Sequence, residues 1–162
     1  MRRRNGPAGN GLRLPRGSSW VAAPSPSADA FLAALAPLLP ANSVLCIEGT
    51  AVSPEARSLF LRHRPTKTQT QKVEPDILEP RSQQFHVDAT ASSLSQISRF
   101  IRDNPSARWG HHIKVYDSEG LLVDWHDADT GWFLHLSSAF PSESTRKLGD
   151  ALGCTFSLEP GA

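Results

Sequence analysis

The chain has 162 residues, of which 39% are hydrophobic and 20% charged, a balance typical of one water-soluble domain with a buried core. No apolar run approaches the roughly 18 residues that a membrane-spanning helix needs, so no membrane partner is expected. Five of the 17 basic residues are arginines that precede the first acid, Asp29; the other 12 face all 16 acidic residues, an excess of four negative charges. Nucleic-acid binding is therefore expected only through the arginine-rich N-terminal segment, if at all.

That segment is rich in Arg, Gly, Pro and Ser and has no hydrophobic periodicity. We therefore predict a disordered basic tail over residues 1–26, followed by a single domain over residues 27–162. Glycine and proline oppose the amphipathic helix of a transit peptide, and the apolar core of a secretory signal is missing. An inert tail or an over-extended gene start is the preferred interpretation.

Two cysteines, Cys46 and Cys154, lie in apolar stretches of the sequence. Two buried, reduced thiols are the simpler interpretation, because a disulfide would need the two strands to be adjacent. Reduced thiols fit a cytoplasmic protein.

The first half of the domain is predicted to contain two helices, a strand between them and one stretch that is hard to assign. Residues 27–40 predict a helix that prolines kink and end, residues 43–49 a buried strand, and residues 53–65 a second helix with proline at its first position. Residues 66–80 contain many threonines but little to bury. Both an exposed edge strand and a long loop fit this stretch, and three prolines favour irregular structure.

In the second half, residues 83–88 alternate as a strand does, and residues 90–104 carry the apolar stripe of a helix. A last helix is predicted up to Gly153, and a short strand over residues 154–158. The sum is about four helices and five to seven strands without strict alternation. The predicted fold class is α+β, with one mostly antiparallel sheet and the helices packed mainly on one face.

Residues 111–137 predict a three-stranded antiparallel meander at the centre of this sheet. A three-residue turn at 118–120 places Ile113 opposite Trp125, and a second turn lies within 127–131. Shifting the third strand by one residue would turn its leucines to the polar face, so alternation fixes the register. The predicted core face consists of Ile113, Val115, Val123, Trp125, Trp132, Leu134 and Leu136.

The opposite face of the meander carries the candidate binding surface, with Leu122 beside it. His112 and His126 are predicted cross-strand neighbours there, as are Asp124 and His135. An exposed aromatic side chain among charged ones is typical of a protein-binding surface, while a second layer of chain covering this face is the alternative. The candidate residues are His112, Lys114, Tyr116, Asp124, His126, Phe133 and His135.

Four of these side chains, His112, Asp124, His126 and His135, are of types that bind zinc. A site for zinc or another divalent metal is therefore one hypothesis, although no short motif such as His-Glu-x-x-His is present. The simpler interpretation is that the outer face of a one-sided sheet must be polar, so no cofactor is expected.

Known catalytic motifs are absent from the sequence. There is no Gly-x-Ser-x-Gly elbow and no phosphate-binding glycine pattern between a strand and a helix. The acidic stretch 127–131 resembles the start of a calcium loop, but the glutamate of the twelfth position is missing, so a turn explains it. Whether the protein is an enzyme stays open, with a non-enzymatic role preferred.

Three short stretches resemble an uncharacterised family of small bacterial α+β proteins without known activity. They are Phe85-His86, His112–Tyr116 and Leu121–Ala128. The resemblance implies a bacterial cytosolic domain and nothing about chemistry.

These observations lead to two functional hypotheses. The first is a small cytosolic, non-enzymatic protein that binds another protein as an immunity or accessory factor. The alternative is a metal-binding protein or metal-dependent hydrolase that uses the His/Asp cluster. The sequence does not specify the oligomeric state.

Overall fold

The computed structural model describes residues 12, 14–15, 17–77 and 80–161. Over these residues the chain forms one seven-stranded sheet and four α-helices, which confirms the α+β class. The strands are β1 (Ser18–Ala23), β2 (Val44–Gly49), β3 (Gln83–Asp88), β4 (His112–Tyr116), β5 (Leu121–Trp125), β6 (Leu134–Ser137) and β7 (Thr155–Pro160). The helices are α1 (Ala28–Leu35), extended by the short 3-10 helix η1 (Ala36–Leu38), α2 (Pro54–Arg62), α3 (Ala91–Asp103) and α4 (Ser142–Leu152).

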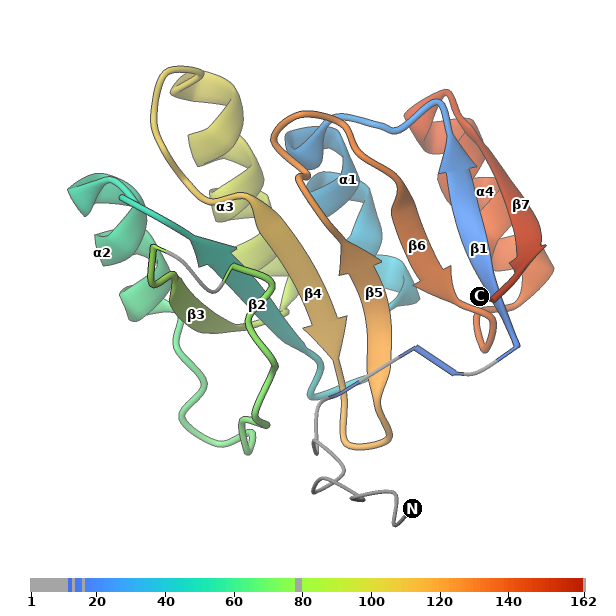
Figure 1. Cartoon of the computed structure of the whole chain (residues 1–162), viewed down its shortest axis with the longest axis horizontal. Coiled ribbons are helices and arrows are strands. Elements are labelled where there is room, and N and C mark those ends of the chain that lie inside the picture. The colour runs from blue at the N-terminus through green and yellow to red at the C-terminus, as the bar shows by residue number, and fades with distance from the viewer. Residues whose placement is uncertain (1–11, 13, 16, 78–79, 162) are drawn as a thin grey trace, which may run out of the picture.

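The strands lie in the order β3-β2-β4-β5-β6-β1-β7, and every neighbouring pair is antiparallel. Figure 1 shows the helices behind the sheet, with β4 and β5 at its centre. Each of the four α-helices contributes to the main core, through Phe31, Phe60, Ile97 and Leu148 among others, against one face of the sheet. No helix of the described residues covers the opposite face, which carries the predicted polar side chains.

Local signals in the sequence set the helix ends. The Ser53 side chain accepts a hydrogen bond from the amide of Ala56 at the start of α2, and Thr90 and Ser93 form a capping box at the start of α3. Gly153 ends α4 in the left-handed conformation, with φ of 66°. Among the described residues, no helix combines the length and the apolar character that crossing a bilayer requires.

The prediction of a disordered tail is wrong for its last part. Residues Ser18–Ala23 form β1, which pairs with β6 on one side and with β7 on the other. The indole of Trp20 also donates a hydrogen bond to the carbonyl oxygen of Phe140, at 3.1 Å. This six-residue strand has too short a pattern to stand out among Gly, Pro and Ser, and it is stabilised by partners more than 100 residues away. Residues 1–11, 13 and 16 of the predicted tail lie outside the described residues.

The meander has the predicted register over most of its length. Ile113 pairs with Trp125 and Val115 with Val123, and in the next pair Trp125 lies opposite Leu134. The difference is a β-bulge, because Tyr116 pairs with Leu121 where Leu122 was expected. The bulge places Leu121 on the face of Tyr116 and lets Leu122 pack against the main core.

The placement of Trp132 on the core face is also wrong. Its side chain is 59% exposed, beside Phe133 at 58%. The ladder between β5 and β6 stops at Trp125 and Leu134, so Trp132 belongs to the connecting loop. Strand alternation therefore does not apply to it.

Candidate functional site

Part of the predicted binding face is covered by the chain itself. Residues 66–77 and 80–82, here called the covering segment, form no helix or strand. They contact β2 and β4 on this face, through Val73 and through hydrogen bonds to Glu48 and Lys114. Val73 is buried in a second small core with Val44, Cys46, Tyr116 and Leu121. Of the two alternatives for this region, the structure has the irregular one.

Three of the seven candidate surface residues are buried as a result. His112, Lys114 and Tyr116 are all inaccessible to a partner. The Tyr116 hydroxyl accepts a hydrogen bond from the amide of Gln71 at 3.0 Å and lies 2.7 Å from Nδ1 of His86. Because burial lowers the pKa of His86 and raises that of Tyr116, this pair is a neutral hydrogen bond.

Glu48 anchors the covering segment, and sequence reasoning missed it. Its buried carboxylate accepts hydrogen bonds from the amides of Asp76 and Ile77, both at 2.9 Å, and from the hydroxyl of Ser82 at 2.7 Å. Burial by itself would raise the pKa of Glu48, but these bonds and the nearby His112 hold it below its ordinary value. Residues 43–49 have the apolar pattern of a buried strand. This pattern does not reveal that the carboxylate of Glu48 lies on the face of the sheet away from the helices.

Lys114 forms the second anchor. Its ammonium lies 2.9 Å from Oδ1 of Asp76 in the covering segment and 3.9 Å from Oδ1 of Asp124 on β5. Burial by itself would lower the pKa of Lys114. The hydrogen bond to Asp76 and the negative charge of Asp124 outweigh burial and raise this pKa. The lysine is thus a charged, structural group at the centre of the face.

His126 lies between two carboxylates. Its Nδ1 is 3.5 Å from Oδ2 of Asp76, and its Nε2 is 3.8 Å from Oδ1 of Asp124. Both of these oxygens are buried and have no hydrogen-bond partner among the described residues. Buried carboxylate oxygens are normally satisfied, so this pair points to an additional group between them.

The ring of His112 completes this cluster. Its centroid is 5.3 Å from that of His126, and one ligand atom from each of Asp76, His112 and His126 lies within 4.8 Å of the others. Asp76 was not predicted, because it belongs to the irregular covering segment and reaches the site only through tertiary contacts. His135 is not part of the cluster: it pairs with Asp124 across the strands as predicted, but its Nδ1 lies 3.1 Å from Oγ of Ser19.

The loop between β5 and β6 presents the exposed aromatic side chains. The rings of Trp132 and Phe133 are 6.0 Å apart and inclined by 71°. The carbonyl oxygen of Trp132 accepts hydrogen bonds from the indole of Trp125 and from the hydroxyl of Ser25, both at 2.7 Å. Two partners from separate parts of the chain therefore fix the backbone of this loop.

The acidic turn in the same loop has a structural role. Asp127 adopts φ of 44°, and its amide donates to Nδ1 of His112 at 3.0 Å. Oδ2 of Asp129 lies 2.9 Å from Nδ1 of His111. Each aspartate of the turn thus contacts one histidine at the start of the meander.

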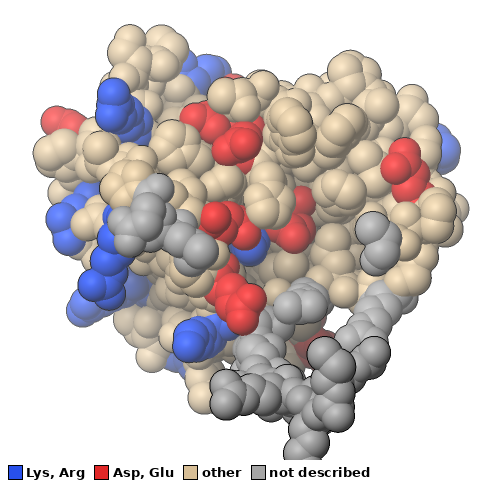
Figure 2. Space-filling model, viewed as in Figure 1, with Lys and Arg blue, Asp and Glu red and all other residues tan. Residues whose placement is uncertain are grey.

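The meander as a whole is strongly acidic. Between residues 111 and 137 there is one basic residue, Lys114, and there are five acidic ones: Asp117, Glu119, Asp124, Asp127 and Asp129. In Figure 2 acidic side chains gather over the centre of this face, while most of the visible basic side chains lie toward one edge.

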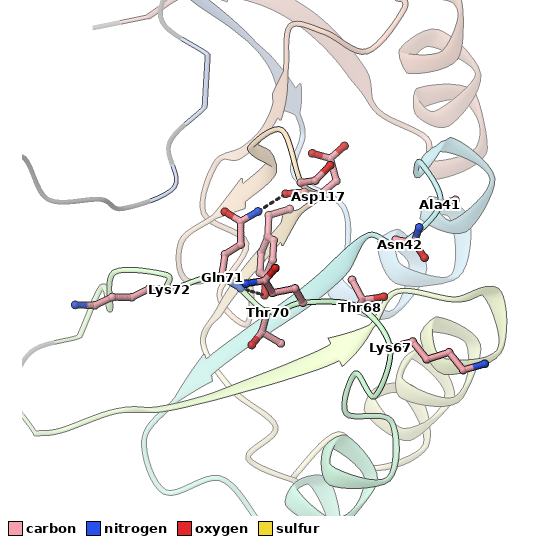
Figure 3. Close-up of a pocket in the computed structure, with 11 residues that line it drawn as sticks. Ala41, Asn42, Lys67, Thr68, Thr70, Gln71, Lys72 and Asp117 are labelled. Carbon is pink, nitrogen blue, oxygen red and sulfur yellow. Dashed lines mark hydrogen bonds between the residues drawn. The ribbon is translucent and has the colours of Figure 1, made fainter.

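A polar cavity of about 800 Å³ lies apart from the histidine cluster, between the covering segment and the turn that joins β4 to β5. In Figure 3 Gln71 crosses it and donates through Nε2 to the carbonyl oxygen of Asp117, at 2.8 Å. The side chains of Lys67 and Lys72 extend in opposite directions, so their charges do not converge on a ligand. This cavity offers little chemistry despite its size.

The cysteines do not form a reactive site. Both are free thiols, and burial with the nearby Glu48 raises the pKa of Cys46 to about 12. Burial also raises the pKa of Cys154. Neither thiol is therefore activated as a nucleophile.

Comparison of the chain with family models, with curated proteins and with solved structures found no match. The resemblance to an uncharacterised bacterial family therefore stays a prediction, and any functional conclusion must come from the geometry of the site.

Proposed function

We propose that this protein is a non-enzymatic binding domain that engages a basic surface of another protein. The contact surface, here called the loop surface, consists of His126, Asp127, Asp129, Trp132 and Phe133. The observation that carries the proposal is the exposure of two adjacent large aromatic side chains, at 59% and 58%. Aromatic side chains of this kind contribute most to binding when a partner covers them.

The loop surface is also held in place before binding. The carbonyl oxygen of Trp132 has two hydrogen-bond donors, and the buried Ala128 donates its amide to the carbonyl oxygen of His111 at 2.6 Å. A partner would therefore not have to order this loop, which lowers the entropic cost of association.

Charge indicates the chemistry of the partner. Asp127 and Asp129 shortly precede the aromatic pair in the sequence, and the side chain of Asp127 is 53% exposed. An arginine of the partner could stack on Trp132 while it pairs with Asp127, because a guanidinium combines both interactions. Free thiols at Cys46 and Cys154 support the cytoplasm as the compartment of this interaction.

The test uses full-length protein that carries a photo-crosslinking amino acid at position 132, expressed in its native host. The matched control carries the same amino acid at position 61, since Leu61 is 50% exposed on α2, away from this loop. We expect one crosslinked partner from position 132 and none from position 61. No crosslink at 132, or the same products from both positions, would contradict the proposal.

The purified partner then allows a quantitative comparison. Replacing both Trp132 and Phe133 with alanine should weaken binding by at least about 30-fold, the effect of a binding hot spot, whereas Leu61→Ala should leave it unchanged. Thermal melting should show that the double variant keeps the fold, since both side chains are exposed. Affinity should also fall as salt rises from 0.1 to 0.5 M, because the partner is basic.

A further inference from the structure

We propose that Asp76, His112 and His126 bind one divalent transition-metal ion of the zinc type. This site goes beyond the protein-binding function above, although it shares His126 and Asp127 with the loop surface, and it includes Asp76, which the sequence did not predict. The first support is geometric, since one ligand atom from each residue lies within 4.8 Å of the others. Two imidazoles and a carboxylate form a ligand set that suits zinc, cobalt or nickel better than calcium or magnesium.

The second support is the pair of carboxylate oxygens without partners. Oδ1 of Asp76 is occupied by Lys114, whereas its buried Oδ2 is free and faces Nδ1 of His126 at 3.5 Å. A metal bound by Oδ2 and Nδ1 would satisfy this oxygen. It would also leave the bond between Asp76 and Lys114 intact.

The third support is that each histidine has a carboxylate near its other nitrogen. Nε2 of His126 lies 3.8 Å from the free Oδ1 of Asp124, and Nδ1 of His112 lies 3.9 Å from Oδ1 of Asp127. Histidines that bind metals usually donate their remaining N–H to such an outer carboxylate, which orients the ring. Asp124 and Asp127 are therefore outer partners rather than ligands.

One existing hydrogen bond must change for the metal to bind. Nδ1 of His112 now accepts the amide proton of Asp127, so the ring proton of neutral His112 resides on Nε2. Coordination through Nε2 requires this proton on Nδ1, which would then donate to the carboxylate of Asp127 and no longer accept from the amide of Asp127. The ring proton thus moves from Nε2 to Nδ1, which leaves the lone pair of Nε2 available to the metal.

The charges also favour a cation. The site is surrounded by the carboxylates of Asp76, Asp124 and Asp127, with that of Glu48 close to Lys114, and Lys114 is the basic residue among them. A net negative charge therefore remains beside the two imidazoles. Lys114 therefore does not exclude the ion, because its ammonium is directed at Oδ1 of Asp76.

The test uses the full chain without an affinity tag, stripped with chelator and titrated with Co²⁺ and then Zn²⁺. We expect visible absorption bands from one bound Co²⁺ per chain, which Zn²⁺ displaces, and a higher melting temperature with either ion. Less than about 0.1 equivalent of Zn²⁺ retained after dialysis, together with no Co²⁺ bands, would overturn the proposal.

Variants assign the ion to these residues. His126→Ala should abolish the Co²⁺ bands without unfolding the protein, because this side chain is 46% exposed. Asp124→Asn should weaken binding by about 10–100-fold, as loss of an outer partner does. His63→Ala is the control, since His63 is bonded to Gln96 at the end of α2. Unchanged Co²⁺ binding by His126→Ala, or equal losses in His126→Ala and His63→Ala, would overturn the assignment.

Discussion

Glu48 holds the covering segment on the sheet, and Glu48→Gln tests this role with little change in volume. Glutamine keeps one carbonyl oxygen but presents an NH₂ group where the second carboxylate oxygen accepts the amide of Asp76. One buried N–H then loses its partner, at a cost of about 1–3 kcal/mol, and the two other hydrogen bonds change from charged to neutral, at about 1 kcal/mol each. Relief of the cost of burying a charge offsets part of this loss. We therefore expect a loss of about 2–3 kcal/mol at pH 7.

The loss should depend on pH, with a defined sign. Folding lowers the pKa of Glu48 below its ordinary value of 4.5, so its carboxylate contributes stability that is fully present above that value. This contribution disappears as the pH falls below 4.5 toward the pKa of the folded state. The difference between wild type and Glu48→Gln should therefore be largest at pH 7 and should shrink in acid.

Urea unfolding followed by tryptophan fluorescence, with chelator present, measures this difference at pH 7 and at about pH 3.5. Hydrogen exchange provides a local measurement, because in the variant the amide of Asp76 loses its acceptor, while the amide of Ile77 keeps a neutral one in place of a charged one. Glu119→Gln is the control, since Glu119 is exposed in a turn and should change stability by less than about 0.5 kcal/mol. A loss below about 1 kcal/mol with unchanged exchange, or an equal loss at both pH values, would refute the anchoring role.

Two further predictions concern the core. Gly49→Ala should destabilise the protein by about 1–3 kcal/mol in urea unfolding, because the added Cβ would lie 2.7 Å from Cα of Gly110. A neutral result would mean that β2 and the chain at Gly110 can separate. Cys46 should resist thiol reagents at pH 8 until the protein unfolds, because it is buried with a pKa of about 12, whereas the half-exposed Cys154 should react sooner. Rapid labelling of Cys46 in the folded protein, measured by mass spectrometry, would show that the covering segment opens.

Sequence reasoning succeeded where local rules decide the structure. The meander register followed from two turn positions and from alternation, because a shift by one residue would have exposed Leu134. The same reasoning failed where the ladder stops, as at Trp132, and at the bulge, where Leu121 took the position expected for Leu122. Alternation holds only for paired residues, and neither the end of a ladder nor a bulge is visible in the apolar pattern.

The candidate site was predicted only in part because it depends on distant contacts. His112 and His126 were correctly placed as neighbours, since they share a hairpin. Asp76 and Glu48 were both missed. The two residues are connected, because Glu48 fixes the backbone of the segment that positions the carboxylate of Asp76. No periodicity marks a segment whose position comes from hydrogen bonds to a buried carboxylate more than 25 residues earlier.

The proposed metal site and the loop surface share His126 and Asp127, so the two kinds of binding should be coupled. A divalent ion on His126 adds positive charge where a basic partner would dock, and it removes the bond that now holds the amide of Asp127 to His112. Both effects oppose the partner, so Zn²⁺ should weaken its binding, and by linkage the partner should weaken Zn²⁺ binding by the same factor. Titrations with the partner at saturating and zero Zn²⁺ measure this factor, and His126→Ala should abolish it. If saturating Zn²⁺ left the affinity of the wild type for the partner unchanged, the ion and the partner would bind independently, and the coupling would be refuted.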